Sequence, residues 1–407
     1  MAFQAYLQKV IREGDLMVRL PGGREFTLGD GSGPPVAVRI VTPRWLARIA
    51  ANPSMGLGEA YMEGGLVLES GAIHDLADLI GRNAKHRPLR RASALWRWWL
   101  DRRLMANARR AARRNVAHHY DLSVDLYRRF LDPDMQYSCA YFPHPGASLE
   151  EAQAAKKRHL AAKLLLQPGQ KVLDIGCGWG GLALSLARAA QVEVDGITLS
   201  TEQLATAKAR AEAAGLAGRA RFSLTDYRDV RGRYDRIVSV GMFEHVGRPN
   251  YQVYFDQMAK LLKDDGVAVL HSIGRADGPA FTQPWIARYI FPGGYIPSLS
   301  EVLPCVERAG LMVTDIEILR LHYAETLKAW RERFAAHRAE IAALYDERFC
   351  RMWEFYLALS EIAFRYRGHF VFQMQLAKKV DAAPITRDYI AEAEAEISAA
   401  RAMRQVA

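Results

Sequence analysis

The sequence predicts an α/β protein, with a mostly parallel, doubly wound sheet in its larger part and a smaller α+β domain at the N-terminus. Beyond residue 115, short apolar runs alternate with helical patterns, and this alternation is typical of βαβ units. The first of these runs ends in a glycine-rich turn, as in doubly wound folds that bind nucleotides. The chain has 407 residues, which is enough for two or three domains of roughly 150 residues each.

The first 100 residues are expected to form the small mixed domain. Residues 26–43 contain two candidate strands around a Gly/Pro turn, and residues 45–52 continue as a helix. Residues 101–114 are predicted to be a basic helical linker. Residues 115–407 are then predicted to form the larger domain.

The larger domain is expected to alternate strands with helices. Its predicted strands are the apolar runs at 170–176, 192–199, 219–226, 234–241 and 266–274, and its predicted helices are 180–190, 201–216 and 251–262. A charged segment at 325–367 also has a helical pattern. The alternation of apolar residues at 370–376 predicts a last strand, which we expect at an edge of the sheet.

The composition excludes several classes of protein. Apolar residues make up 50% and aromatic residues 10%, which excludes a mainly disordered chain. No run approaches the ~18 apolar residues of a transmembrane helix, and the charges within the first 15 residues argue against a secretion signal. The cysteines lie far apart and form no C-x-x-C pair, so we expect neither disulfides nor a metal site, and a reducing cytosol; they are Cys139, Cys177, Cys305 and Cys350.

The positive charge is concentrated in one stretch of the chain. The formal net charge is +10, while residues 82–114 alone hold twelve basic residues and one acid, Asp101. Residues 95–100 interleave tryptophan with arginine. Nucleic acid would accept such a surface through its phosphates and by stacking, and an anionic membrane would accept it through its headgroups. A solvated helical connector is the third interpretation.

The motif Val-Leu-Asp-Ile-Gly-Cys-Gly-Trp-Gly-Gly carries the clearest chemistry. Gly176, Gly178 and Gly181 satisfy G-x-G-x-x-G where a strand ends and a helix begins, and glycines let the backbone turn sharply and approach a ligand there. NAD and S-adenosylmethionine (SAM) both bind such turns. Asp195, about 20 positions on, could hold the ribose of NAD. Asp174, two residues before the first glycine, is more typical of SAM-dependent methyltransferases.

Two further strand ends carry candidate ligand contacts. Thr198 ends the second strand, and after it Ser200 and Gln203 fit a helix capping box, so a structural role is as well supported as contact with a ligand. Asp226 and Tyr227 follow the third strand, where the aromatic ring could flank an adenine. A plain loop is the alternative interpretation of this second pair.

Together, these motifs resemble the cyclopropane-fatty-acid synthase family, which includes bacterial phospholipid cyclopropane synthases and mycolic-acid cyclopropane synthases. The resemblance extends from His118 to Leu376 and, more weakly, to residues 55–64 of the first domain, which favours the long phospholipid-modifying form. It rests on six motifs in order, at residues 118–142, 172–183, 226–229, 234–247, 269–274 and 289–298.

The resemblance implies a Rossmann-like SAM-dependent methyltransferase domain that acts on unsaturated acyl chains of membrane phospholipids. The implied reaction transfers the SAM methyl group to a cis double bond, forms a carbocation and closes a cyclopropane ring when the new methyl group loses a proton. The implied base is a bound bicarbonate held by Cys139, Glu244, His271, Ile273 and Tyr323. The implied SAM contacts are Tyr137, Ser138, Asp174, Gly176, Gly178, Gly180, Thr198, Gln203 and Tyr227.

The same resemblance predicts a place in the cell and a set of partners. A mid-chain double bond lies on the order of 10 Å below the headgroups. We therefore expect a cytoplasmic protein peripherally attached to the inner face of the membrane, with its basic stretch on an anionic surface. The small domain is expected to contact lipid, the membrane or the second copy of a homodimer.

Three other functions stay open at this point. A SAM-dependent fatty-acyl methyltransferase could give a methylene or methyl-branched chain from the same cation, because the product depends on which proton leaves. A nucleic-acid methyltransferase is suggested by the basic stretch, but no amine-holding motif accompanies the catalytic motifs, so no nucleic-acid partner is expected. A catalytically silent lipid-binding module would require the loss of motif residues, and all of them are intact.

Overall fold

The computed structural model describes residues 2–86 and 122–406, which form two compact units. As far as these residues extend, the smaller unit comprises Met1–Trp96, Phe281–Pro292 and Ala324–His369, and the larger unit comprises Arg97–Ala280, Gly293–Tyr323 and Phe370–Ala407. The smaller unit therefore includes two segments from the second half of the chain. The basic linker expected at residues 101–114 lies outside the described residues, so the domain boundaries stay a prediction.

The smaller unit contains a four-stranded sheet in the order β2-β1-β3-β4. Strand β1 pairs antiparallel with β2 and parallel with β3, so the two strands predicted around the Gly/Pro turn exist but are separated by β1. The predicted helix begins at Pro43, where the Thr42 side chain caps it by accepting a hydrogen bond from the backbone N–H of Trp45. The strands are β1 (Asp15–Arg19), β2 (Glu25–Leu28), β3 (Pro35–Ile40) and β4 (Leu66–Ser70).

Helices from both parts of the chain pack together in the smaller unit. Helix α16 lies against α3 and α4, and the contact is close at Gly81, where a Cβ atom would lie 2.4 Å from Ile362. The helical pattern predicted at residues 325–367 is confirmed as α14, α15 and α16. The helices are α1 (Ala2–Val10), α2 (Pro43–Ala51), α3 (Pro53–Met62), α4 (Ile73–Arg82), α12 (Pro284–Tyr289), α14 (His322–Ala336), α15 (Arg338–Leu344) and α16 (Glu347–Tyr366).

The larger unit is built on a seven-stranded sheet in the order β10-β11-β9-β8-β5-β6-β7. The pairs from β9 to β7 are all parallel, and β10 and β11 are antiparallel. The mostly parallel, doubly wound sheet and its five predicted strands are therefore confirmed. The strands are β5 (Lys171–Ile175), β6 (Glu193–Thr198), β7 (Ala220–Leu224), β8 (Tyr234–Val240), β9 (Leu262–Arg275), β10 (Met312–Leu319) and β11 (His369–Ala377).

The last strand differs in position from the sequence prediction. Strand β11 exists, but it lies between β10 and β9, and β10 occupies the edge. All seven residues from Val371 to Ala377 are buried, as expected for a strand with neighbours on both sides. Strand β10 was not predicted because Thr314, Asp315 and Glu317 interrupt its apolar pattern.

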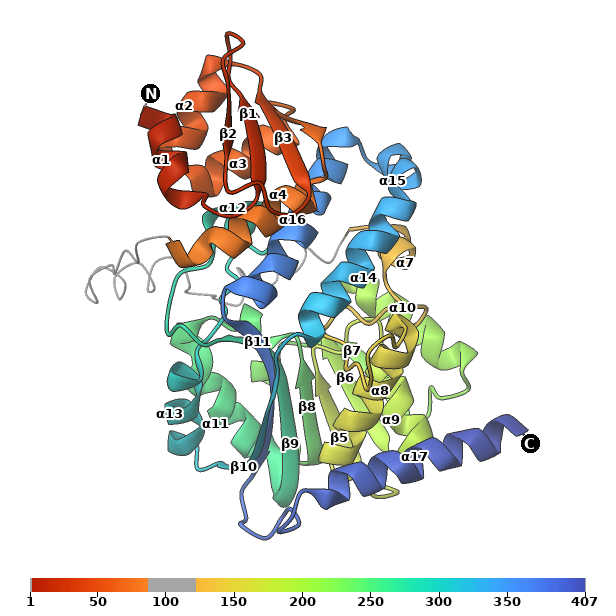
Figure 1. Ribbon diagram of the computed structural model, residues 1–407. Coiled ribbons are helices and arrows are strands. Elements are labelled where there is room, and N and C mark those ends of the chain that lie inside the picture. The colour runs from red at the N-terminus through yellow and green to blue at the C-terminus, as the bar shows by residue number, and fades with distance from the viewer. Residues whose placement is uncertain (1, 87–121, 407) are drawn as a thin grey trace. The chain divides into compact units, whose positions relative to one another are not determined.

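Helices cover both faces of the larger sheet (Figure 1), with α11 and α13 on one face and α8, α9 and α17 on the other. The core beneath α8 and α9 is apolar, with Leu160 and Leu186 packed near Val172 and Val194 of the strands. The three predicted helices are confirmed as α9, α10 and α11. The helices of this unit are α7 (Val124–Phe130), α8 (Leu149–Lys163), α9 (Gly181–Ala190), α10 (Thr201–Ala213), α11 (Tyr251–Leu261), α13 (Leu299–Arg308) and α17 (Asp388–Val406).

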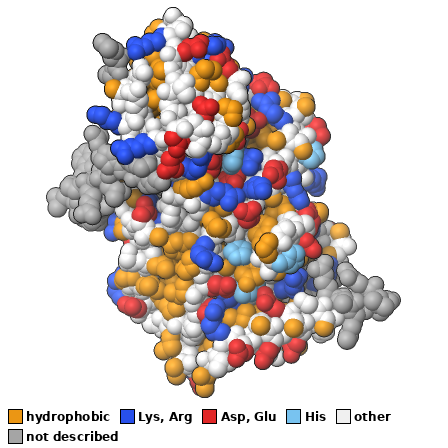
Figure 2. Space-filling model, viewed as in Figure 1, with side chains coloured by type: hydrophobic (Ala, Val, Ile, Leu, Met, Phe, Trp, Pro, Cys, Tyr) orange, Lys and Arg blue, Asp and Glu red, His pale blue; other side chains and the backbone are white. Residues whose placement is uncertain are grey.

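Acidic and basic side chains are interspersed over the face shown in Figure 2. The stretch that holds most of the basic excess, residues 82–114, falls outside the described residues beyond residue 86. Among the helices of residues 2–86 and 122–406, none combines the length and the apolar character needed to cross a bilayer.

Candidate active site

The glycine motif forms the turn between β5 and α9 in the larger unit. The backbone N–H groups of Gly176 and Cys177 both donate to the carbonyl of Ile197 on β6, each at 3.0 Å, which fixes the start of the turn. Gly176 and Gly178 have positive φ angles of 86° and 53°, a region that side chains disfavour. A Cβ atom at Gly178 would meet nothing within 4 Å, so the backbone is open to the adjoining space at this point.

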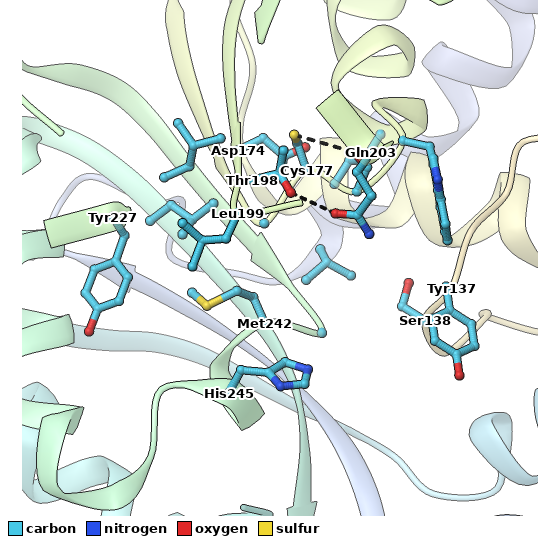
Figure 3. Close-up of a pocket in the computed structure, with 18 of the residues that line it drawn as sticks. Tyr137, Ser138, Asp174, Cys177, Thr198, Leu199, Gln203, Tyr227, Met242 and His245 are labelled. Carbon is cyan, nitrogen blue, oxygen red and sulfur yellow. Dashed lines mark hydrogen bonds between the residues drawn. The ribbon is translucent and has the colours of Figure 1, made fainter. Parts of the chain in front are cut away.

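A pocket adjoins this turn at the carboxyl ends of the parallel strands (Figure 3), where open α/β sheets bind their ligands. Of the nine candidate cofactor residues, Gly180 is not among those that line the pocket; it caps α9, with a φ angle of 82°. The other eight all line it: Tyr137, Ser138, Asp174, Gly176, Gly178, Thr198, Gln203 and Tyr227.

Thr198 and Gln203 meet at the end of β6. The Thr198 hydroxyl donates to Gln203 Oε1 at 2.7 Å, the contact drawn in Figure 3. Ser200 caps α10 as predicted, because its hydroxyl accepts from the backbone N–H of Gln203 at 3.2 Å. The Gln203 side chain bonds to Thr198 in place of the Ser200 backbone, so only half of the predicted capping box forms. This places the Gln203 amide in the pocket wall.

Asp174 ends β5 as a buried carboxyl with 1% of its surface exposed. Burial raises its pKa to about 7, although the positive charge of Lys156 opposes the rise. Its Oδ2 atom is buried and has no hydrogen-bond partner within the described residues. A buried carboxyl oxygen without a partner, beside a turn with open backbone, fits the amine or hydroxyl groups of a polar ligand. These residues therefore fit a bound SAM.

The two aromatic candidates lie at opposite sides of the pocket in Figure 3. The Tyr137 ring packs edge-on against Tyr127, with ring centroids 5.3 Å apart. The Tyr227 ring packs in the same way against Tyr254, also at 5.3 Å, and the Arg228 guanidinium lies 5.4 Å from its centroid. Both rings are fixed by their neighbours and are only partly buried, so each leaves surface free for contact with a ligand.

Sequence reasoning missed Lys156, which supports the segment that carries Tyr137 and Ser138. This lysine is fully buried on α8, and its Nζ atom donates to Gln136 Oε1 and to Ser138 Oγ, both at 2.8 Å. Gln153, also on α8, donates to the Ser138 carbonyl at 3.0 Å. Burial lowers the pKa of Lys156 to about 8. Nothing in the charged pattern of residues 149–163 distinguishes this lysine from its neighbours.

Glu244 and Ile273, two of the five candidate bicarbonate ligands, are in direct contact. Glu244 Oε1 accepts a hydrogen bond from the backbone N–H of Ile273 at 2.7 Å. The Glu244 carbonyl accepts from the backbone N–H of Tyr295 at 2.9 Å, which holds the short helical turn Phe243–His245 in place. The Ile273 N–H, expected to be a donor to the anion, is thus bonded to the carboxylate in this structure.

His271 lies on β9 beside the end of β8, opposite Val240 in the strand pairing. Burial, with added repulsion from Lys156, lowers the pKa of His271 well below its ordinary value, so its imidazole is neutral. Burial raises the pKa of Glu244 to about 7, although the Ile273 N–H and the Ser272 hydroxyl favour the charged form. Within the described residues, Glu244 Oε2 and His271 Nε2 are buried atoms without a hydrogen-bond partner.

Cys139 and Tyr323 come from two segments that are tied together. Cys139 is buried, with its thiol 3.2 Å from the Ala140 carbonyl, and Tyr323 is half-buried at the start of α14. Three residues beyond Cys139, the backbone N–H of Phe142 donates to Nδ1 of His322 at 2.9 Å. None of the five candidate bicarbonate ligands is among the described residues that line the pocket, but their neighbours Ser138 and His245 are.

His245 and Met242 were not proposed as pocket residues from the sequence. Both line the pocket, on the segment that follows β8. Burial lowers the pKa of His245 to about 4, so its imidazole is neutral. The sequence signal was their place just after a strand end, which the motif containing Glu244 already marked.

Comparison with known families decides the relationship. The family described as mycolic acid cyclopropane synthetase matches residues 107–374. The chain belongs to this family. Its fold and relatives make it an enzyme of the SAM-dependent methyltransferase class.

Several members of the mycolic acid cyclopropane synthetase family cover much of the chain. The cyclopropane-fatty-acyl-phospholipid synthase of Escherichia coli K12 is 40% identical over 358 residues, covering 85% of this chain and 89% of the relative. The tuberculostearic acid methyltransferase of Mycobacterium tuberculosis is 39% identical over 355 residues, covering 82% and 81%. The structure of mycolic acid cyclopropane synthase CmaA1 complexed with SAH and CTAB is 35% identical, with a TM-score of 0.62, covering 65% of this chain and 97% of that one.

Proposed function

We propose that this enzyme transfers a methylene group from SAM to the cis double bond of an unsaturated acyl chain in a membrane phospholipid, giving a cyclopropane fatty acid. The proposal is carried by the buried pair Glu244 and His271, which places an unpartnered carboxyl oxygen and an unpartnered imidazole nitrogen beside the pocket. A methyltransferase that only alkylates an amine has no need of a second buried polar pair at this place. Ring closure needs one, because a proton must leave the new methyl group.

SAM would be held by the eight candidate residues that line the pocket. When bound, SAM supplies an electrophilic methyl group. The chain would orient it through the open backbone at Gly178, the buried carboxyl of Asp174 and the rings of Tyr137 and Tyr227. Because an alkene is a weak nucleophile, the contribution of the protein is mainly the positioning of the two reactants.

A bound bicarbonate is proposed as the base, with Cys139, Glu244, His271, Ile273 and Tyr323 around it. Glu244 Oε2, when ionised, can accept the acidic hydrogen of the anion, and His271 can donate to one of its oxygens if the proton is on Nε2. The Ile273 N–H would act through the Glu244 carboxylate that it already orients. The proton leaves the new methyl group for the bicarbonate, and the C–H electron pair forms the third bond of the ring. Burial of the site keeps water from trapping the cation.

Attachment to the inner face of an anionic membrane is the part of the proposal that concerns location. Support comes from the phospholipid named for the E. coli relative, which matches a larger share of this chain than the mycolic-acid enzyme does. The basic residues and tryptophans at 82–114 would supply the contact, and their pull would weaken with salt. A homodimer through the small domain remains a prediction from the sequence.

A second candidate function has its own support. The M. tuberculosis relative, 39% identical, is named as a tuberculostearic acid methyltransferase, so a methylene or methyl-branched acyl chain is the alternative product. Both products begin with the same methyl transfer. They differ in which proton the base removes.

The test is a reaction with SAM and vesicles of cis-unsaturated anionic phospholipid, in CO2-free buffer with and without added bicarbonate. The fatty acids are then examined by NMR. We expect upfield cyclopropane protons, formed faster when bicarbonate is present. Vinylidene protons would establish the branched-chain alternative, and unchanged lipid together with methylated RNA or DNA would overturn both.

A further inference from the structure

A buried amide contacts the imidazole of His271 from the neighbouring strand. Gln373 lies on β11, next to β9 in the sheet, and its side chain is fully buried. Its Nε2 atom lies 3.2 Å from His271 Nδ1. This contact involves a residue outside the sequence motifs, and it acts on the nitrogen that does not face the proposed anion.

The contact determines which nitrogen of His271 carries the proton. An amide nitrogen can only donate, so an NH2 group placed against Nδ1 requires a lone pair on Nδ1. A neutral imidazole has a single N–H, which must then be on Nε2. His271 Nε2 is the buried atom that has no hydrogen-bond partner within the described residues. The arrangement therefore presents a free N–H donor.

Protonation of the imidazole cannot supply this donor instead. Burial disfavours the charged form of His271, and three groups on α8 add positive charge nearby: Lys156, Lys163 and His159. Since the imidazole stays neutral, the choice of tautomer decides whether Nε2 donates or accepts.

A donor at this position matters because another is already used. The backbone N–H of Ile273 donates to Glu244 Oε1 at 2.7 Å, so it is not free for an anion. An ionised Glu244 has only acceptors, and it would repel a negative oxygen. A bicarbonate beside Glu244 therefore needs a donor on its other side.

We propose that Gln373 is a positioning residue that holds His271 as the Nε2–H tautomer, so that this N–H donates to the anionic oxygen of bicarbonate while Glu244 Oε2 accepts its hydroxyl hydrogen. The inference rests on the proposed function, since it assigns the donor for the base of that reaction. Gln373 does not touch the anion. It acts through the imidazole.

Gln375 provides a matched control on the same strand. It is also buried, two residues further on, but its amide donates to the Lys163 carbonyl at 2.6 Å and to the Tyr389 hydroxyl at 2.8 Å. Removing this amide costs hydrogen bonds of the same kind without touching His271. A loss of stability is expected from Gln375→Leu, with no change at the imidazole.

The experiment combines histidine NMR with kinetics on the full-length protein. In wild-type protein labelled with 15N-histidine, we expect the His271 pattern of an Nε2–H tautomer. Gln373→Leu should lose this preference, and Gln373→Glu should reverse it, because a carboxylate accepts from Nδ1–H. Both should raise the KM for bicarbonate by roughly 10-fold, the effect of losing one hydrogen bond to a charged group, with the KM for SAM unchanged.

The outcomes separate the inference from the function on which it rests. A wild-type Nδ1–H tautomer, or a Gln373→Leu variant that needs no more bicarbonate than Gln375→Leu, would overturn the inference alone. A wild-type enzyme that makes no cyclopropane, or whose rate ignores bicarbonate, would overturn the proposed function or its base, and the assigned donor with it. If Gln373→Leu does not fold, Gln373→Glu retains the side-chain length and gives the same comparison.

Discussion

The ring of Tyr141 stacks on the imidazole of His322, with ring centroids 5.0 Å apart and planes inclined by 10°. On its other contact, Tyr141 stacks on His159 of α8 at 4.4 Å. The backbone N–H of the next residue, Phe142, donates to His322 Nδ1. The segment that follows Cys139 is thus fixed to the residue that precedes Tyr323, and two candidate bicarbonate ligands share one support.

Tyr141→Leu is expected to lower kcat by about 5- to 10-fold, because a lost ring stack of about 1 kcal/mol leaves the start of α14 less well held. The KM for SAM should not change, since Tyr141 is outside the pocket. Tyr141→Phe retains the ring and should behave as wild type. Steady-state kinetics of the two variants check this, and an equal loss in both would exclude stacking as the cause.

The pH dependence of Glu244 separates its catalytic role from its effect on stability. Burial raises its pKa to about 7 from 4.5. The folded state therefore binds the proton more tightly, and the contribution of this group to stability falls as pH rises from about 4.5 to about 7. Activity should rise over the upper part of the same range, because only the ionised carboxyl accepts the bicarbonate hydrogen.

Glu244→Gln is expected to lower activity by about 100-fold or more at pH 8, where the wild-type carboxyl is ionised. Its free energy of unfolding at this pH should equal or exceed that of wild type, since no buried charge remains. Rates at a fixed bicarbonate concentration and denaturant unfolding across pH 5–8 measure both. A variant that is less stable and yet fully active would contradict the assignment.

The buried Lys156 predicts a second pH effect, at higher pH. Its pKa is lowered by burial to about 8 from 10.5, so the unfolded state binds more protons between these values and stability rises with pH there. Lys156→Met should abolish this rise. It should also weaken SAM binding by about 10-fold, because Gln136 and Ser138 lose a shared donor. Calorimetry with Arg158→Met as the control on the same helix tests both effects.

The sequence was sufficient where the physical signal is local. The parallel strands and the glycine turn follow from apolar runs and from the need for positive φ angles, and the structure places eight of the nine candidate SAM residues around one pocket. Six motifs in order identified the family that the comparison shows.

Other features depend on contacts between distant residues, which no local pattern encodes. Gln373 and His271 are 102 positions apart, and neither residue type at its position signals the pairing. Lys156 is indistinguishable from exposed lysines on α8 until the packing is known. Strand β10 is polar enough to escape an apolar pattern, and its presence is what moves β11 away from the edge.

Neutralising basic residues in the 82–114 stretch tests attachment to the membrane. Changing Arg97, Arg102 and Arg103 to glutamine should weaken binding to anionic vesicles on the order of 100-fold at low salt, at about 1 kcal/mol per charge. Vesicle co-sedimentation measures this. A charge-matched triple variant at exposed positions of the larger unit should bind nearly as well as wild type; it changes Arg188, Arg219 and Arg231. Equal binding by all three proteins would exclude the stretch as the membrane contact.

Gly178 and Gly146 allow backbone strain to be separated from loss of ligand space. Both have positive φ angles, 53° and 86°, and at both a Cβ atom would meet nothing within 4 Å, but only Gly178 lines the pocket. Alanine at either position should cost about 1–2 kcal/mol of stability. Only Gly178→Ala should also weaken SAM binding, by about 10-fold, because its methyl group would project into the space that the open backbone provides. Titration calorimetry with SAM decides between them: a similar affinity for both variants would mean that the turn acts through its conformation and not through close approach to the ligand.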